Sequence, residues 1–215
     1  DMKIPYHIAI EGSIGVGKTS LAKILGERLD SKLVLEEFDE NPFLVDFYKN
    51  SERYAFQTQL FFLLSRYRQQ QLLQQTDLFT KTLVSDYMFV KDRLFAALNL
   101  NDKEMSLYNS VASILEKSVS SPDLVIFLQS DTDRLMQNIK IRGREYEKMI
   151  DWKYIDALNQ IYNEYFFRYD ASPLLIINTN DIDFVNNKND LEEIIQFIRT
   201  PVEGTRYFNP LKSIE

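Results

Sequence analysis

Short apolar runs alternate with longer segments of helical spacing along most of the chain. Five runs rich in β-branched and other apolar residues are expected to be buried strands, at 6–10, 33–35, 82–85, 124–128 and 174–177. Five longer segments place apolar residues three and four positions apart, as helices do, at 18–29, 54–75, 103–118, 132–141 and 153–167. This alternation predicts a three-layer α/β domain, in which helices cover both faces of a five-stranded parallel sheet.

The whole chain, residues 1–215, is expected to be one domain. It contains no internal repeat and no linker rich in proline, glycine or serine. With 45% hydrophobic and 27% charged residues, its composition is that of a globular protein. In parallel sheets ligands bind beyond the carboxyl ends of the strands. Polar residues that directly follow a strand are therefore the first candidates for chemistry.

Charge and composition exclude several classes of function. The formal net charge of −7 argues against nucleic acid as a partner, because phosphate backbones are bound by basic surfaces. The chain has no cysteine, which excludes disulfides, thiolate catalysis and thiolate metal sites. No apolar stretch reaches the ~18 residues of a membrane span, and no signal-peptide pattern is present at the start. We therefore expect no membrane partner and a cytoplasmic location.

A phosphate-binding loop follows the first predicted strand. The octapeptide Gly12-Ser13-Ile14-Gly15-Val16-Gly17-Lys18-Thr19 matches G-x-x-x-x-G-K-[ST] in full. Its glycines allow the backbone to direct several N–H groups at one anion, at the positive end of the helix that follows. Lys18 is expected to reach the β- and γ-phosphates of ATP, and Thr19 to place its hydroxyl on Mg²⁺. The motif predicts a site for a nucleoside triphosphate.

Acidic residues stand at the ends of the next two predicted strands. Glu36 and Glu37 follow the second strand, and Asp86 follows the third. Carboxylates that face a phosphate loop can serve as a general base and as a metal-associated group. Solvated loop charges are the alternative interpretation of these positions.

Two arginines separated by a glycine interrupt the helical pattern near residue 141. Arg142 and Arg144, with Gly143 as a hinge, are typical of a lid at about residues 140–150 that closes over phosphate oxygens. Paired surface arginines are the alternative. The tetrad 187–190 spells the guanine-reading N-K-x-D of GTPases, but no D-x-x-G is present, so we predict a solvated turn there.

Taken together, these motifs resemble the deoxynucleoside kinase family, which includes deoxycytidine, deoxyguanosine and bacterial deoxyadenosine kinases. The similarity extends from about residue 8 to residue 184. It implies ATP-dependent phosphorylation of the 5′-hydroxyl of a deoxynucleoside, in nucleotide salvage. Glu36 matches the catalytic base of the family, with Glu37 as the second candidate. Lys18 and Arg142 are the other catalytic residues implied, and Thr19 and Asp86 are the residues implied for Mg²⁺.

The resemblance also implies a substrate site on residues between the second and fifth predicted strands. Tyr48 and Glu147 match the pair that holds the 3′-hydroxyl of the sugar. Gln59, rather than Gln57, matches the base-binding glutamine of a long helix, and Arg66 and Asp92 match further base-reading residues. The pair Arg66 and Asp92 resembles members that accept adenine, guanine or cytosine more than those that accept thymine. The loop from Glu36 to Asn41 is closest to bacterial purine-type members. The resemblance therefore predicts deoxyadenosine or deoxyguanosine as substrate.

At one substrate position the sequence departs from the family. Tyr87 stands where many members have an arginine aimed at the 5′ oxygen, so Arg142 or Lys18 would have to supply the cation there. Arg142 and Arg144 match the phosphate-binding arginines of the lid. Asp183 and Phe184 belong to a segment that resembles the loop around the adenine of ATP.

Relatives pair two long helices in a dimer, so segments 54–75 and 103–118 are expected to form a homodimer contact. Two other functions share part of the pattern. A nucleoside monophosphate kinase of the thymidylate kinase type has a phosphate loop, an Asp-Arg pair and a lid, but it needs an additional cationic site for the acceptor phosphate. A non-catalytic nucleotide sensor would need neither a base nor a lid.

Overall fold

The computed structural model describes residues 6–75, 82–200 and 203–208. Its centre is a parallel sheet in the order β2-β3-β1-β4-β5-β6. The strands are β1 (His7–Glu11), β2 (Lys32–Val34), β3 (Leu83–Ser85), β4 (Leu124–Gln129), β5 (Leu174–Asn178) and β6 (Thr205–Phe208). The expected three-layer α/β class is confirmed. The expected number of strands was wrong, because β6 adds a sixth at one edge.

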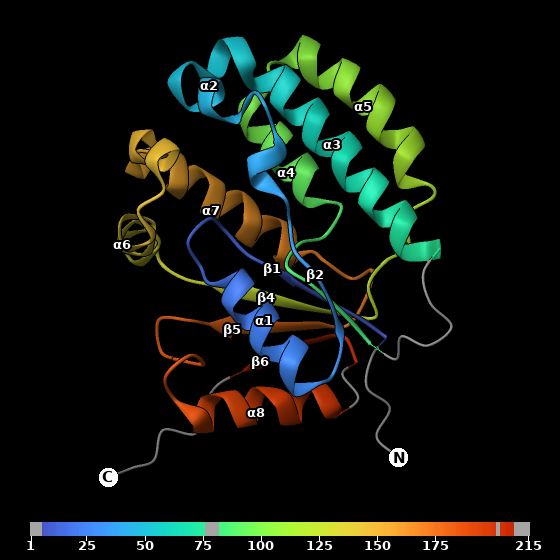
Figure 1. The fold of residues 1–215 in the computed structure, drawn as a ribbon, viewed down its shortest axis with the longest axis vertical. Helices are drawn as coiled ribbons and strands as arrows, with labels where there is room; N and C mark the ends of the chain where they lie inside the picture. The colour runs from blue at the N-terminus through green and yellow to red at the C-terminus, as the bar shows by residue number, and fades with distance from the viewer. Residues whose placement is uncertain (1–5, 76–81, 201–202, 209–215) are drawn as a thin grey trace.

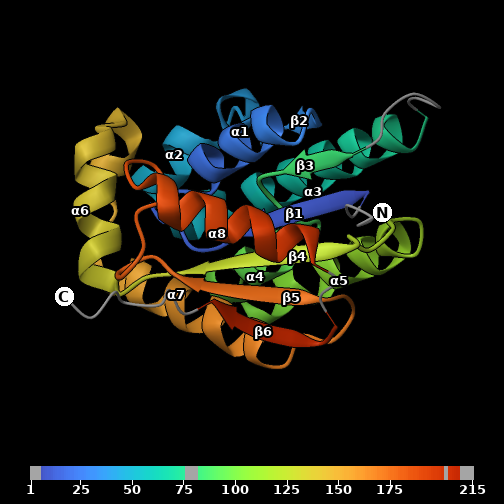
Figure 2. The ribbon, with the colours of Figure 1, turned by 90° about the horizontal axis from the view of Figure 1, so that it is seen from below.

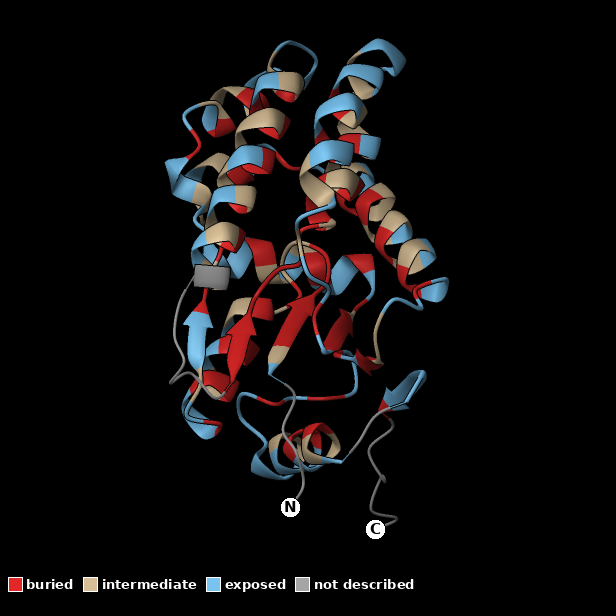
Figure 3. Cartoon of the chain, turned by 90° about the vertical axis from the view of Figure 1, so that its right-hand side faces the viewer, coloured by how far each residue is buried: buried red, intermediate tan, exposed pale blue. Residues whose placement is uncertain are grey.

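Alternate residues of the strands face two separate cores. Ile8 and Ile10 of β1 pack with α1 (Lys18–Arg28) and α8 (Lys188–Arg199). Ala9, between them, faces the core formed with α4 (Lys91–Asn99) and α7 (Trp152–Phe167). Figures 1 and 2 show these helix pairs on opposite sides of the sheet. Because both faces are covered, the central strands are buried along most of their length, as Figure 3 shows in red.

A second layer of helices lies outside α4. The helices α3 (Ser51–Gln75) and α5 (Asp102–Glu116) pack against each other and against α4, around a small core that includes Leu63, Ala96 and Tyr108. The short helix α2 (Leu44–Lys49) packs against the first part of α3. As a result, α2 and α3 form a wall beyond the ends of β1 to β3 (Figure 1).

Three helices were not predicted, and one segment was predicted wrongly. The unpredicted helices are α2, α4 and α8. Helix α8 is strongly amphipathic, with buried Ile194, Ile195 and Ile198 facing the sheet. The tetrad 187–190 is not a solvated turn but the start of this helix. Asn187 caps it by accepting hydrogen bonds from the backbone N–H groups of Asn189 and Asp190.

The remaining elements gather at the carboxyl ends of the strands. Helix α6 (Thr132–Arg142) follows β4 and stands at that end of the sheet (Figure 2). Two short 3-10 helices, Phe38–Glu40 after β2 and Glu145–Met149 after α6, lie at the same end. Within the described part of the chain, no helix is both long and apolar enough to cross a membrane.

Candidate active site

The phosphate loop connects β1 to α1 with a backbone that requires glycine at key points. Gly12 has φ 154°, and a Cβ there would lie 2.6 Å from the carbonyl oxygen of Leu128. Gly17, with φ 102°, is the residue from which α1 begins. Lys18, the first residue of α1, folds back so that Nζ donates to the carbonyl oxygens of Gly12 (2.7 Å) and Ser13 (3.2 Å). The expected turn at the start of a helix is confirmed.

The ammonium group of Lys18 is buried and unusually easy to deprotonate. Burial, and then repulsion by the charge of Lys91, lowers the pKa of Lys18 to about 8. The carboxylates of Glu11, Glu36 and Asp86 oppose this shift without cancelling it. A bound phosphate group would raise the pKa of Lys18 again, because an adjacent negative charge favours the protonated amine.

Asp86, at the end of β3, ties the phosphate loop to the chain after β2. Its Oδ2 accepts a hydrogen bond of 2.7 Å from the hydroxyl of Thr19, and its Oδ1 accepts one of 2.8 Å from the backbone N–H of Glu36. A hydroxyl and a carboxylate in contact are oxygen ligands of the kind that Mg²⁺ takes when phosphates complete its shell. The donor set at Thr19 and Asp86 therefore fits the expected metal.

Glu36 lies in a buried network of charges. Its Oε1 accepts from Nε of Arg66 at 2.9 Å and also contacts Nη2, while its Oε2 contacts Nζ of Lys91. Burial would raise the pKa of the Glu36 carboxyl, but the charges and hydrogen bonds of Arg66 and Lys91 outweigh it and lower the pKa to about 2. Glu36 is therefore ionised at neutral pH. Its neighbour Glu37 is exposed.

Arg66 extends this network to Asp92 on α4. Nη1 of Arg66 contacts Asp92, whose other oxygen accepts a 2.7 Å hydrogen bond from the hydroxyl of Tyr108. Burial raises the pKa of Asp92 to about 6, although the charge of Arg66 opposes the shift. Asp92 thus holds Arg66 by Nη1, the nitrogen that does not contact Glu36.

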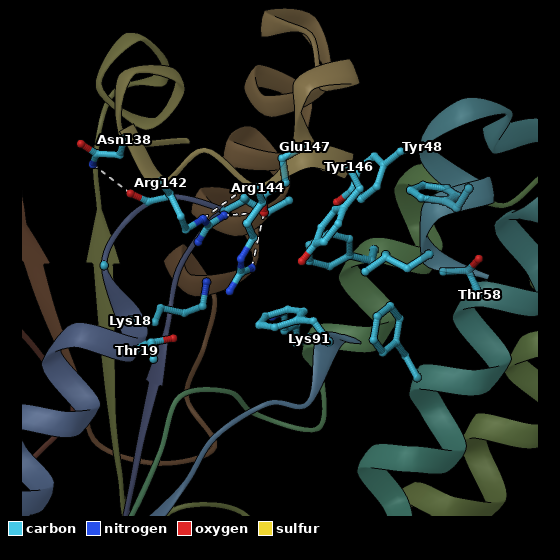
Figure 4. Close-up of a pocket in the computed structure, with 18 of the residues that line it drawn as sticks. Lys18, Thr19, Tyr48, Thr58, Lys91, Asn138, Arg142, Arg144, Tyr146 and Glu147 are labelled. Atoms are coloured by element: carbon cyan, nitrogen blue, oxygen red, sulfur yellow. Dashed lines mark hydrogen bonds and ion pairs between the residues drawn. The ribbon is translucent and has the colours of Figure 1, made fainter. Parts of the chain in front are cut away.

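A cavity of about 530 Å³ lies between the phosphate loop, the lid segment and α3. Figure 4 shows Lys18 and Thr19 on one side, Tyr48 and Thr58 on the other, and the lid residues Arg142, Arg144 and Glu147 above. Its walls include Ile14, Gly15, Gly17, Phe38, Gln59, Phe62, Arg66, Lys91, Phe95, Asn138 and Tyr146. One end of the cavity is therefore cationic and the other is aromatic and amide-lined.

Side chains of the lid segment contact one another, and the preceding helix α6 contacts the phosphate loop. Gly143, with φ 67°, ends α6 and turns the chain. Arg142 donates from Nε (3.1 Å) and Nη2 (2.6 Å) to the two oxygens of Glu147, and Arg144 lies 3.5 Å from the same carboxylate. From α6, the amide of Asn138 donates to the carbonyl of Gly15 at 2.9 Å.

The opposite end of the cavity carries groups suited to a sugar and a base. The ring of Tyr48 stacks on that of Tyr146 at a centroid distance of 5.8 Å. Burial raises the pKa of Tyr48 well above its usual range, so its hydroxyl remains a donor. Gln59 is buried, and among the described residues no donor pairs with its Oε1. A buried acceptor left unpaired costs about 1 to 3 kcal/mol, so a ligand donor at this point would be stabilised.

Several expected residues do not line the cavity, among them Glu36 and Asp86. Glu36 contacts Arg66 and Lys91, which are in the wall. The Tyr87 ring packs among Val34 and Leu83, and its hydroxyl contacts Gln69, so this side chain lies outside the cavity wall. Asp92 lies behind Arg66, as described above. Asp183 is exposed and accepts from backbone N–H groups of its own loop. Phe184 is buried beside the phosphate loop, with its ring edge 3.5 Å from where a Cβ on Gly17 would lie.

Sequence reasoning missed Lys91, Glu11 and the ring of Phe38. Lys91 lines the cavity and contacts Glu36, and its Nζ lies 4.9 Å from the centre of the Phe38 ring. Glu11 is fully buried and accepts from the N–H groups of Gly12 (3.1 Å) and Met88 (2.8 Å), which joins the phosphate loop to the segment after β3. The one available signal was position, since Lys91 directly precedes Asp92 on a segment that follows a strand.

A family model supports the assignment suggested by these features. Residues 8–203 match the model described as "Deoxynucleoside kinase". The chain is 33% identical to a deoxyguanosine kinase of Bacillus subtilis (strain 168), an alignment that covers 92% of this chain and 98% of the relative. It is 34% identical to a deoxyadenosine kinase of Dictyostelium discoideum, over 95% of this chain and 82% of the relative.

The fold leads to the same family. A solved structure of deoxyadenosine kinase from M. mycoides with bound dCTP superimposes with a TM-score of 0.77 at 26% identity, covering 89% of this chain and 98% of that one. Sequence and fold thus agree over most of the length of each protein. The chain belongs to the deoxynucleoside kinase family and is a phosphotransferase that acts on a nucleoside hydroxyl.

Proposed function

We propose that this kinase transfers the γ-phosphoryl group of ATP to the 5′-hydroxyl of a purine deoxynucleoside, with Glu36 as the base. One observation carries the proposal: Asp86 binds the Thr19 hydroxyl with one oxygen and the Glu36 backbone with the other. This shared partner holds the base candidate next to the phosphate loop. Glu37 lies outside that arrangement, because its side chain is exposed.

Catalysis then consists mainly of positioning and charge stabilisation. Glu36, ionised because Arg66 and Lys91 lower its pKa, takes the proton of the 5′-hydroxyl as the oxygen attacks phosphorus. Lys18 and the lid arginines Arg142 and Arg144 balance the charge that spreads over the phosphoryl oxygens. Thr19 and Asp86 would hold Mg²⁺, which would supply further positive charge to stabilise the phosphates.

The sugar and base ends of the site are assigned from the cavity. Tyr48 and Glu147, both in its wall, would hold the 3′-hydroxyl. Gln59 would accept a hydrogen bond from the base at its unpaired Oε1 and donate one from its amide nitrogen, a pairing that amides make with adenine. The names of the relatives, which include deoxyguanosine and deoxyadenosine kinases, support a purine. Asp183 and Phe184 would border the adenine of ATP.

Deoxyadenosine or deoxyguanosine is expected to give the highest kcat/KM of the four deoxynucleosides. Gln59→Leu is expected to lower that kcat/KM roughly 10- to 100-fold, since each amide–base pairing is worth about 1 to 3 kcal/mol. Steady-state rates with ATP and each deoxynucleoside measure both effects.

The matched control is Gln57→Leu on the same helix, because Gln57 is exposed and should leave the rates unchanged. A preference for thymidine of about tenfold or more would contradict the purine assignment.

We further propose that two copies of the chain associate through α3 and α5. Each chain would form one domain, and the protein would be located in the cytoplasm. Leu107, Val111 and Ile114 form an apolar stripe along α5 at helical spacing, and each is exposed. Leu64 on α3 is also exposed, and α3 packs beside α5 (Figure 1). Exposed apolar stripes on adjacent helices are typical of an interface.

The protein is expected to sediment as a particle of twice the 25.4 kDa chain mass at micromolar concentration. Ile114→Glu should shift it towards the single-chain mass, because a carboxylate would be buried against apolar side chains. Phe167→Glu, at a more exposed position on α7 (81% against 68% for Ile114), serves as control and should not. A wild-type particle of 25.4 kDa would contradict the proposed dimer.

A further inference from the structure

Lys91 is a buried cation at the junction of the two halves of the cavity. It is the first residue of α4, its side chain is 3% exposed, and it lines the cavity. Nζ contacts Oε2 of Glu36 and lies 4.9 Å and 5.7 Å from the ring centres of Phe38 and Phe95. Figure 4 shows it between the side of the cavity that carries Lys18 and the side that carries Thr58.

Among the described residues, Lys91 is one of two cations that contact Glu36. Arg66 already makes two contacts to Oε1 of Glu36, and Asp92 fixes Arg66 from its other end. A second buried ammonium on Oε2 adds a desolvation penalty, which the ring faces of Phe38 and Phe95 offset in part. The position of Lys91 in the cavity wall, rather than behind it, suggests a partner that enters the cavity.

The presence of Lys18 in the same cavity wall indicates what that partner is. Lys18 and Lys91 are both buried, and both line the cavity. Two buried ammonium groups in the wall of one cavity form a favourable site for an anion. Lys18 belongs to the phosphate loop, so the anion that meets both is the phosphoryl group in transit.

The same position also meets the acceptor. A hydroxyl that gives its proton to Glu36 must come within about 3 Å of the carboxylate. Because Nζ of Lys91 contacts that carboxylate, it then lies beside the acceptor oxygen as well. Tyr87, expected to stand near this oxygen, packs away from the cavity, and Arg142 is engaged with Glu147.

We propose that Lys91 is a catalytic residue of this kinase, a cation that contacts the 5′ oxygen and the transferred phosphoryl group. The inference rests on the proposed function. In the step, the 5′-hydroxyl proton passes to Glu36 and the O5′–P bond forms. The bond from phosphorus to the bridging oxygen breaks, and its electron pair leaves with ADP. The side-chain charge of Lys91 stabilises the negative charge that moves from ATP towards the acceptor.

The absence of cysteine from the sequence allows a direct test of the charge. Lys91→Cys is expected to lower kcat roughly 10²-fold or more, with a much smaller change in KM for the nucleoside and in Kd for ATP. The thiol is then alkylated in urea with 2-bromoethylamine, which restores an ammonium at nearly the length of lysine, or with iodoacetamide, which adds a neutral amide. After refolding, only the ammonium adduct should regain at least about a tenth of wild-type kcat.

Lys23→Cys, at an exposed position of α1, passes through the same alkylation and refolding and reports recovery of the native enzyme. A Lys91→Cys kcat within about threefold of wild type, or equal kcat for the two adducts, would overturn the inference. If the cysteine variant does not fold, Lys91→Arg and Lys91→Met are compared instead. Where both have similar melting temperatures, the arginine variant should have a kcat at least about ten times that of the methionine variant. Equal kcat values for the two variants would overturn the inference.

The wild type separates this inference from the function on which it rests. If wild-type enzyme forms deoxynucleoside monophosphates and the Lys91 variants match it, the inference alone fails. If the wild type forms none from any deoxynucleoside, the proposed function fails and the inference with it.

Discussion

Replacing Glu36 by glutamine is expected to lower kcat by a factor of about 10² to 10⁴, the usual effect of losing a positioned general base. The substitution keeps the shape of the side chain but removes the group that takes the 5′-hydroxyl proton. Arg66 and Lys91 remain in place, so Kd for ATP should change little. Steady-state turnover with deoxyadenosine or deoxyguanosine, with calorimetric titration of ATP, measures the two quantities separately.

Glu37→Gln is the matched control, because Glu37 is the adjacent carboxylate and is exposed. It should retain turnover close to the wild type. Melting curves of both variants are also needed. Glu36→Gln removes the negative charge that pairs with the buried cations Arg66 and Lys91, and this should lower the melting temperature. Turnover that falls with Glu37→Gln, but not with Glu36→Gln, would transfer the role of base to Glu37.

Replacing Lys18 by methionine should lower kcat by roughly 10²- to 10³-fold or more, because it removes a fixed charge from the transferred phosphoryl group. Lys18 begins α1, and its Nζ lies against the carbonyl oxygens of the phosphate loop. Methionine keeps most of the volume, so the loop should retain its conformation. Weaker binding of ATP is also expected, as seen by titration calorimetry.

Lys23→Met tests whether loss of any lysine on α1 has this effect. Lys23 is exposed on the same helix, and its replacement should leave kcat unchanged. The phosphate-loop assignment would be in error if the Lys18 variant kept more than about a tenth of wild-type kcat.

The fold class could be predicted because its signals are local. Buried strands such as β4, with five consecutive buried residues, and a phosphate loop between a strand and a helix are visible in the sequence. The strand β6 was not predicted, because three of its four residues are exposed. Its sequence therefore shows neither a continuous apolar run nor an alternation of apolar and polar residues. Helix α4 is only nine residues long, and two of its four buried residues, Lys91 and Asp92, are charged.

The candidate site could be predicted for residues that belong to a sequence motif. It could not be predicted for residues whose position depends on tertiary packing. Glycines, Lys18 and Thr19 follow from the motif itself. The structure places Gln59, Arg66 and Glu147 in the cavity wall, where the family resemblance implied them. The role of Lys91 depends on a contact between α4 and the segment after β2, a long-range pairing that no local pattern reveals. The orientation of Tyr87 could not be predicted for the same reason, because it is set by packing against Val34 and Leu83.

Product analysis tests the central claim most directly. The enzyme is incubated with ATP and Mg²⁺, and with either a purine deoxynucleoside or its 5′-monophosphate, and the products are separated by chromatography with mass detection. The nucleoside is expected to yield its 5′-monophosphate and an equal amount of ADP, and the monophosphate should not react. Formation of a diphosphate from the monophosphate, or ADP release that no nucleoside stimulates, would contradict the assignment of Glu36 and the phosphate loop to phosphorylation of a 5′-hydroxyl.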